Sequence, residues 1–170
     1  MNRDVSWDVQ DEAPFLLSGT EQTGDASMKG FRDKREFKEV FEHVFALMNE
    51  HPKVGRRLRD AHAPHRFLIT DLGLELNVDA APDQEEKQGR FLKWVWGPAD
   101  WKPLITLRMS STTANRFFQG KENVALAVAL GRVKVSGPLV TILRLAPVTG
   151  AIHPVFRGWL EKTGRNHLLA

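Results

Sequence analysis

Few residues of this chain have the types and spacing that catalysis or metal binding requires. His62 and His65 lie close to Asp60 and Asp71 in the sequence, and side chains of these types can bind a metal ion. The two histidines flank Pro64 in a predicted loop, however, and lack the helical spacing of the histidine pair that many zinc enzymes use. We therefore interpret both as solvated loop histidines, and we expect no metal site and no cofactor.

The sequence also lacks the patterns of phosphate binding and nucleophilic catalysis. Gly120-Lys121 precedes Glu122 instead of Ser or Thr and does not follow a predicted strand, so it does not match a phosphate-binding loop. The chain has no cysteine, which removes thiol nucleophiles, thiolate metal sites and disulfides together. These observations give little support for an enzyme.

Charge is small in sum but uneven along the chain. A net charge of +3 over 170 residues gives no reason to expect a nucleic acid partner. An acidic loop is formed by Asp79, Asp83, Glu85 and Glu86, and a basic cluster by Lys53, Arg56, Arg57 and Arg59. The basic cluster is either a solvated helix face or a surface that docks transiently on anionic membrane headgroups, where each basic residue contributes roughly 1 kcal/mol.

Among the predicted helices and strands, the clearest local pattern lies between Gly120 and Gly137. One predicted helix ends at Gly120, and a second runs from Glu122 to Leu130 and ends at Gly131. Residues 132–136 then alternate polar and apolar types, as a half-buried strand does. Two glycine-terminated helices therefore lead directly into a strand.

Hydrophobic periodicity predicts the remaining elements. Apolar residues at helical spacing indicate a long helix over residues 33–49 and a shorter one over 52–61, while helices begun by Pro138 and Pro154 come last. Strands are predicted at residues 66–70, 74–79, 90–96, 104–109 and 132–136. This order predicts an α+β fold with a single five-stranded, mostly antiparallel sheet that helices cover on one face.

The segment from Gly120 to Gly137 also resembles, without a gap, a motif of the sterol carrier protein type-two family, whose members are also called non-specific lipid-transfer domains. The matching positions are Gly120, Lys121, Asn123, Ala127, Gly131, Arg132, Lys134, Val135 and Gly137. Residues 105–111 resemble the strand-to-helix entry of that family, and residues 139–145 resemble the helix after its last strand. The resemblance spans about residues 35–163 and implies that the sheet and helices enclose an apolar tunnel.

The resemblance places the functional residues among large apolar side chains, each of which is otherwise an ordinary core residue. A ligand in such a tunnel gains about 25 cal/mol for each Å² of apolar surface that leaves water. The candidate lipid-binding residues are Phe41, Phe45, Met48, Leu76, Val78, Trp94, Trp96, Leu107, Met109, Phe117, Phe118, Val124, Val128, Leu139 and Leu143.

Three functions are compatible with these patterns. The first is a non-catalytic lipid-binding or lipid-transfer domain that holds an acyl, phospholipid or isoprenoid-like ligand in the tunnel. The second is an accessory subunit that presents an apolar intermediate, such as a quinone precursor, to partner enzymes. The third is an enzyme acting on lipids, for which only Thr106, Arg108 and Asn123 offer polar groups near the tunnel.

The length suits one domain with an additional arm. We expect an N-terminal arm over residues 1–32, a lipid-binding domain over 33–164 and a C-terminal tail over 165–170. Trp7 and Phe15 of the arm are expected to dock either on the domain or on a second copy of it, which would give a homodimer. Since the sequence shows neither an unbroken apolar run of membrane-spanning length nor a secretory signal, we expect a cytoplasmic protein.

Overall fold

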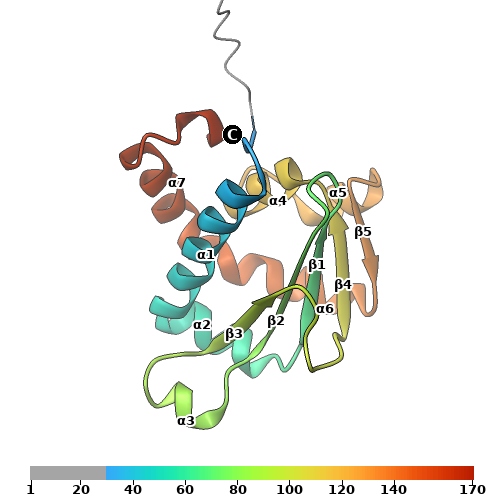
Figure 1. The fold of residues 1–170 in the computed structure, drawn as a ribbon. Helices are drawn as coiled ribbons and strands as arrows, with labels where there is room; N and C mark the ends of the chain where they lie inside the picture. Colours follow the sequence, from blue (N-terminus) through green and yellow to red (C-terminus); the bar gives the residue numbers. More distant parts are fainter. Residues whose placement is uncertain (1–29) are drawn as a thin grey trace, which may run out of the picture.

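The described part of the chain begins at Gly30. The computed structural model describes residues 30–170, which form helices and one five-stranded sheet (Figure 1). Residues 1–29, with Trp7, Phe15 and the homodimer that we expected through them, lie outside the described residues.

Two helices at the start of the domain follow directly from their capping residues. Helix α1 (Lys34–Glu50) begins after Asp33, whose side chain accepts a hydrogen bond from the backbone N–H of Glu36 at 2.8 Å. Helix α2 (Pro52–Asp60) begins with a proline, which has no N–H that would remain unpaired in the first turn. Both helices agree with the predicted ones to within one residue.

The sheet has the strand order β3-β2-β1-β4-β5. Only the central β1 and β4 pair in parallel, and the other three pairs are antiparallel, which confirms a mostly antiparallel sheet. A short helix, α3 (Asp83–Glu86), lies in the loop before β3. The strands are β1 (His65–Ile69), β2 (Leu74–Ala80), β3 (Leu92–Trp96), β4 (Ile105–Met109) and β5 (Val133–Ser136).

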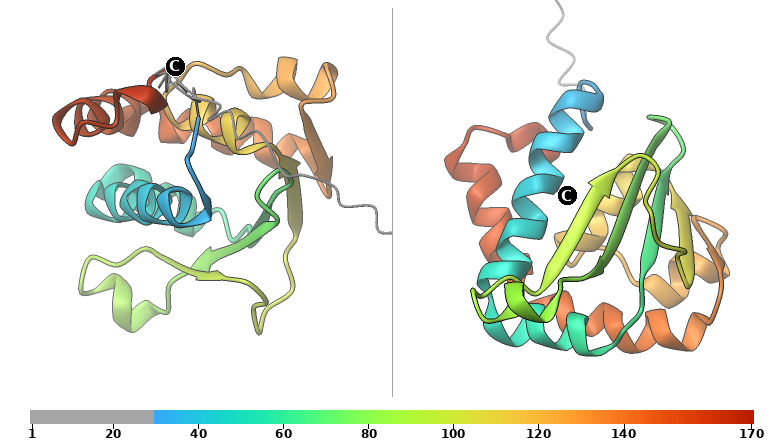
Figure 2. Two further views of the ribbon diagram at one scale, coloured as in Figure 1. Left: turned by 45° about the horizontal axis from the view of Figure 1, so that its top comes forward. Right: turned by 60° about the horizontal axis from the view of Figure 1, so that its bottom comes forward.

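The remaining helices gather with α1 and α2 on the concave side of the curved sheet, as Figures 1 and 2 show. Since apolar and polar residues alternate along β2 and β4, one face of the sheet is apolar and receives these helices. This arrangement confirms the predicted α+β fold. The elements are α4 (Ser111–Phe118), α5 (Val124–Ala129), α6 (Leu139–Leu145), the 3₁₀ helix η1 (Ala146–Ile152), α7 (His153–Lys162) and the 3₁₀ turn η2 (Asn166–Leu168).

Glycines fix the chain path on both sides of α5. Gly120 has a φ of +71° and ends the α4 segment, and a side chain there would run into the ring of His153. Gly137 has a φ of +109° and lies against the carbonyl of Leu104, which leaves no room for a Cβ atom. The glycine pattern of the sequence therefore reflects backbone geometry that only glycine adopts without strain.

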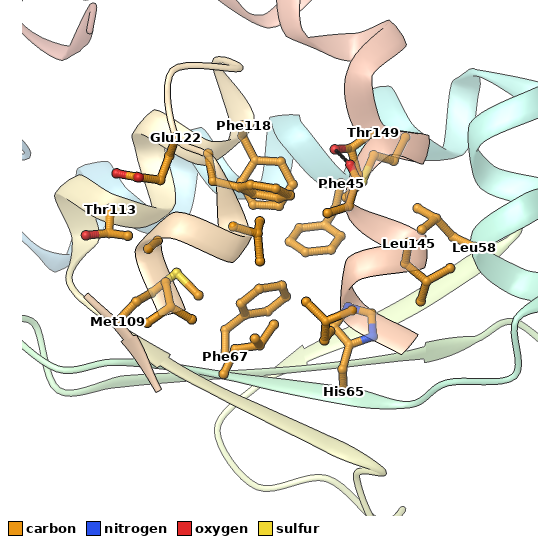
Figure 3. Close-up of a pocket in the computed structure, with 18 of the residues that line it drawn as sticks. Phe45, Leu58, His65, Phe67, Met109, Thr113, Phe118, Glu122, Leu145 and Thr149 are labelled. Carbon is orange, nitrogen blue, oxygen red and sulfur yellow. Dashed lines mark hydrogen bonds between the residues drawn. The ribbon is translucent and has the colours of Figure 1, made fainter. Parts of the chain in front are cut away.

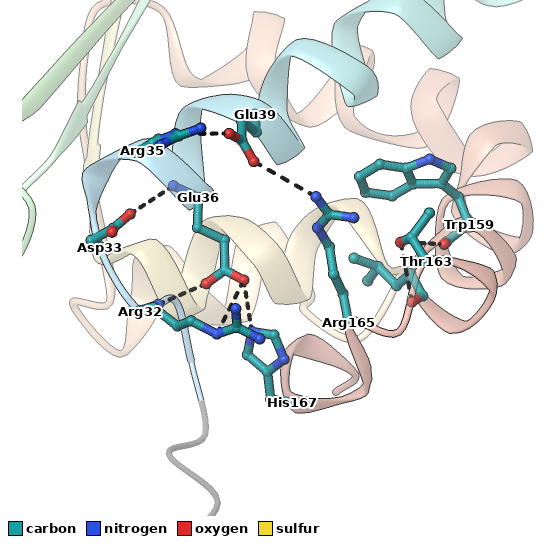
Figure 4. A network of polar contacts seen from close by, with 10 residues as sticks. Arg32, Asp33, Arg35, Glu36, Glu39, Trp159, Thr163, Arg165 and His167 are labelled. Carbon is teal, nitrogen blue, oxygen red and sulfur yellow. Dashed lines mark hydrogen bonds and ion pairs between the residues drawn. The ribbon is translucent and has the colours of Figure 1, made fainter.

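The last residues of the chain pack against the domain. Leu168 is 2% exposed, and its carbonyl accepts hydrogen bonds from the buried side chains of Asn115 at 2.7 Å and Gln119 at 2.8 Å. Figure 4 shows that this end also meets the start of α1, where His167 Nε2 lies 2.8 Å from Glu36 Oε1. Residues 165–170, which we expected as a tail, thus contribute a buried side chain and satisfy two buried amides.

One helical stretch, Leu139–Lys162, is long and apolar enough by length and composition to cross a membrane. Only 22% of its most apolar 18-residue segment is buried in the structure. The stretch comprises α6, η1 and α7, and the chain changes direction between α6 and α7 (Figure 2). A single helical stretch of this kind is weak evidence for a membrane span.

Candidate functional site

An apolar pocket lies between the inner face of the sheet and the helices above it. The cavity has a volume of about 80 Å³, and about 750 Å³ of space, part of it open to solvent, lies between the lining residues. The pocket is therefore extended but narrow. Its walls comprise Phe45, Met48, Leu58, His65, Phe67, Leu92, Leu107, Met109, Thr113, Phe117, Phe118, Glu122, Val124, Ala127, Val133, Ile142, Leu145, Ala146 and Thr149 (Figure 3).

The length of the covering helices explains the position of the pocket. Helix α1 has 17 residues and packs closely on β2 and β3, where its Phe37 and Phe45 meet the rings of Trp96 and Trp94. Helices α5 and α6 have only 6 and 7 residues, and they contribute walls on the side of β4 and β5. Since short helices cover the sheet less completely than α1 does, space remains beneath them.

About half of the residues that we predicted to contact a lipid line this pocket. They come from α1, β4, α4 and α5, four elements that are separate in the sequence. The structure brings together Phe45, Met48, Leu107, Met109, Phe117, Phe118 and Val124.

The predicted residues that lie beneath α1 are core residues outside the pocket wall. Phe41, Leu76 and Val78 are each at most 2% exposed, because α1 packs directly over β2. Trp94 and Trp96 are partly buried, and their indole N–H groups donate to the two carboxylate oxygens of Glu42, Trp94 at 2.9 Å. Val128 on α5 packs partly buried against the core and does not line the pocket either.

The rotation of α6 about its own axis places two further predicted lipid-binding residues outside the pocket wall. Leu139 and Leu143 are 38% and 40% exposed, whereas Ile142 is 8% exposed and lines the pocket. Ile142, Leu145 and Ala146 are three or four residues apart and so share one face of the helix. Apolar residues occupy both faces of α6, and therefore the sequence alone did not show which face is inward.

His65 is a pocket residue that the sequence interpretation placed wrongly. It is the first residue of β1 and not part of a loop, and it lies on the inner face of the sheet with Phe67 and Ile69. The available signal was the alternation of the strand, since His65 precedes the buried Phe67 by two residues. His62, in contrast, is exposed in the preceding turn, as expected.

The hydrogen bonds of His65 assign its ring nitrogens. Nδ1 lies 2.9 Å from the carbonyl oxygen of Ala63, and because a carbonyl only accepts, Nδ1 carries the proton. The side chain is partly buried by accessible surface, but protein atoms surround it densely enough that burial lowers its pKa below the ordinary value of 6.5. The Ala63 hydrogen bond and the Asp79 charge raise this pKa by smaller amounts. The ring is therefore neutral at pH 7, with Nε2 as a hydrogen-bond acceptor.

The other polar side chains in the pocket wall are occupied by protein partners. The Glu122 carboxylate turns away from the pocket in Figure 3 and pairs with Arg132 at 2.8 Å and Arg116 at 3.5 Å. Thr113 Oγ1 lies 3.0 Å from Ser110 Oγ, and Thr149 Oγ1 donates to the Ala146 carbonyl at 2.9 Å. These groups close the wall and leave an apolar surface towards the interior.

The residues considered for an enzyme acting on lipids do not meet in the pocket. Thr106 and Arg108 lie on the outer face of β4, opposite Ser136 and Lys134 of β5. Asn123 caps α5, where its side chain accepts from the N–H of Leu126 at 3.0 Å. Among residues 30–170, no group of three or more His, Cys, Asp or Glu side chains could hold a metal ion.

The basic cluster divides into exposed and paired residues. Lys53, Arg56 and Arg57 are exposed on α2. The Arg59 side chain is only 11% exposed and pairs with Asp83 and with Glu86, the latter at 3.2 Å. Arg59 therefore joins α2 to the α3 loop and does not extend the exposed basic surface.

Comparison with known proteins confirms the fold. No protein-family model and no curated protein matches the chain. The sterol carrier protein domain 2 of Helicoverpa armigera aligns with a TM-score of 0.51 and 16% identity, over 69% of this chain and 87% of that one. A ubiquinone synthesis protein, UbiJ-SCP2, aligns with a TM-score of 0.49 and 10% identity, over 66% of this chain and 94% of that one.

A third similar structure belongs to a much larger enzyme. The inverting sec-alkylsulfatase Pisa1 from Pseudomonas sp. aligns with a TM-score of 0.43 and 16% identity over 53% of this chain, which spans only 14% of the length of that enzyme. The likeness to the Helicoverpa domain agrees with the resemblance found in the Gly120 to Gly137 motif. The described domain has the fold of the sterol carrier protein type-two domains.

Proposed function

We propose that this protein is a non-catalytic lipid-binding domain that holds one acyl or isoprenoid-like chain in the pocket beneath α4, α5 and α6. The observation that carries the proposal is the pocket itself, whose walls are apolar apart from His65, Thr113, Glu122 and Thr149. Small-molecule sites are typically concave and mostly apolar with a small number of polar groups, and the lining of this pocket has that character. The cytoplasmic location expected from the sequence belongs to the same proposal.

The shape of the pocket favours a single flexible chain over a bulky ring system. The cavity volume of about 80 Å³ is small for a pocket with so many lining residues, so the walls approach one another closely. A linear chain can follow such a path, and each buried methylene contributes about 0.8 kcal/mol. No charged partner for a headgroup is needed within the pocket.

Two variants, each replacing an alanine by phenylalanine, test this site. Ala146 lines the pocket, whereas Ala151, in the same 3₁₀ helix, is exposed. Ala146→Phe should fill the pocket and weaken binding of a fluorescent fatty acid at least about tenfold, because several methylenes lose their contacts. Ala151→Phe adds the same ring to the surface and should leave the affinity unchanged. Equal affinities for the two variants, both folded, would show that the ligand binds elsewhere.

The accessory role is the second proposal. It is favoured by large apolar side chains that remain exposed on α5, on the residue that follows it and on α6, since such surface often contacts a partner. They are Leu126, Leu130, Leu139, Val140 and Leu143. Native mass spectrometry of protein from its own host separates the alternatives: a retained lipid supports a carrier, an intact protein complex supports the accessory role, and a covalent or converted product supports an enzyme.

A further inference from the structure

His65 is the one polar side chain of the pocket wall whose free polar atom is not occupied by the described residues. Thr113, Glu122 and Thr149 each use their side-chain oxygens in contacts with the protein. His65 uses Nδ1 for the Ala63 carbonyl, and within residues 30–170 no protein group bonds to Nε2. An acceptor with a free lone pair therefore lies in an otherwise apolar wall.

The ring that carries this acceptor forms part of the pocket wall. His65 stands on the inner face of β1, two residues before Phe67, and its ring meets the Phe67 ring edge-on with centroids 5.2 Å apart. Figure 3 shows the ring rising from the sheet towards Leu145, with one edge facing the pocket. The Ala63 bond holds the ring in this orientation.

We infer that His65 selects ligands whose buried end carries a hydroxyl donor, such as a long-chain alcohol or a phenol with an apolar tail. This inference rests on the proposed function and specifies the ligand class of the same pocket. The hydroxyl donates its proton to Nε2, while the chain follows the apolar walls.

The same chemistry discriminates against two related lipid classes. An ester or ether has no proton to donate and leaves Nε2 without a partner, which costs affinity in a buried site. An ionised fatty acid would need the charged form of His65, which burial disfavours. Both classes still gain from apolar contacts, so they are expected to bind, but less tightly than the alcohol.

The test compares 1-tetradecanol with methyl tetradecyl ether, which differ in the donor and share the chain. Wild-type protein should bind the alcohol about 2- to 13-fold more tightly than the ether, the range expected for one neutral hydrogen bond. His65→Phe should bind both equally. His65→Gln, which retains a side-chain acceptor, should recover part of the preference.

A matched variant controls for the loss of a histidine. His62 is exposed and has a φ of +45°, a conformation that asparagine tolerates, so His62→Asn should retain the full preference for the alcohol. A second measurement uses the wild type alone: the ¹⁵N resonance of His65 Nε2 should shift with the alcohol and not with the ether.

The outcomes separate the two proposals. Equal affinity of the wild type for both ligands, or a preference that persists in folded His65→Phe, would overturn the role of His65 and leave the lipid pocket intact. Failure of folded wild-type protein to bind either ligand would overturn the lipid-binding function and this inference with it.

Discussion

The orientation of α6 can be tested by two neighbouring substitutions, Ile142→Ala and Leu143→Ala. Ile142 is 8% exposed and lines the pocket, whereas Leu143, the next residue of the helix, is 40% exposed and does not line it. Both substitutions shorten a branched apolar side chain to alanine in the same short helix. They should nevertheless have different effects, because only one side chain faces the interior.

The expected magnitudes follow from burial. Ile142→Ala removes three carbons from a buried site and should lower the free energy of unfolding by about 2–5 kcal/mol. Leu143→Ala should lower it by about 1 kcal/mol or less, as for a substitution near the surface. If one or two of the Ile142 carbons contact the ligand, their loss weakens binding by about 0.8–1.6 kcal/mol, or about 4- to 14-fold.

Urea denaturation and ligand titration measure the two effects independently. The midpoint of unfolding should fall for Ile142→Ala with an unchanged slope, and the affinity for a fluorescent fatty acid should fall with it. Titrations are made at urea-free conditions where both variants are folded, so that unfolding does not reduce the apparent affinity. A larger loss of stability or affinity in Leu143→Ala would refute the assigned phase of α6 and the pocket wall built from it.

Two further predictions concern histidine titration and membrane contact. Because burial lowers the pKa of His65, His43 and His153 below 6.5, the unfolded chain binds more protons than the folded one below that pH, and stability should fall as the pH drops from 6.5 towards the folded values. Urea midpoints across this range should show the slope, and His65→Phe should reduce it without abolishing it; a slope identical to that of the wild type would contradict a depressed pKa at His65. On the surface, Arg56→Glu with Arg57→Glu should reduce binding to anionic vesicles at low salt, since both residues are exposed and each contributes roughly 1 kcal/mol. Cosedimentation measures this effect, and binding that is insensitive to both salt and the double substitution would rule out electrostatic docking through α2.

Local patterns were sufficient to predict the helices, the strands and the fold class. Alternation along β2 and β4 gave the buried face of the sheet, and the capping residue Asp33 placed the start of α1. Gly120 and Gly137 have positive φ angles in the structure, so the glycines in the sequence marked real constraints on the chain path. These features depend on neighbouring residues, which a sequence displays directly.

The division of the inner face into core and pocket could not be predicted in the same way. Leu76 on β2 and Leu107 on β4 have the same residue type and the same orientation towards the helices, yet only Leu107 lines the pocket. The difference arises from the element above each strand, a 17-residue helix over one part of the sheet and short helices over the other. Which helix packs over which strand depends on residues far apart in the chain, and therefore no local sequence pattern indicates it.

The motif from Gly120 to Gly137 is informative about function because of the wall it builds. Its acidic residue Glu122 joins Arg116 on α4 to Arg132 before β5, and the Glu122 side chain is only 6% exposed. This ion pair network holds the α5 segment in place, while Val124 and Ala127 face the pocket from the same segment. The charged residues of the motif therefore position the wall, while the pocket side of the segment is apolar. Selectivity must then come from outside the motif, and in this pocket His65 on β1 is the residue with the chemistry to provide it.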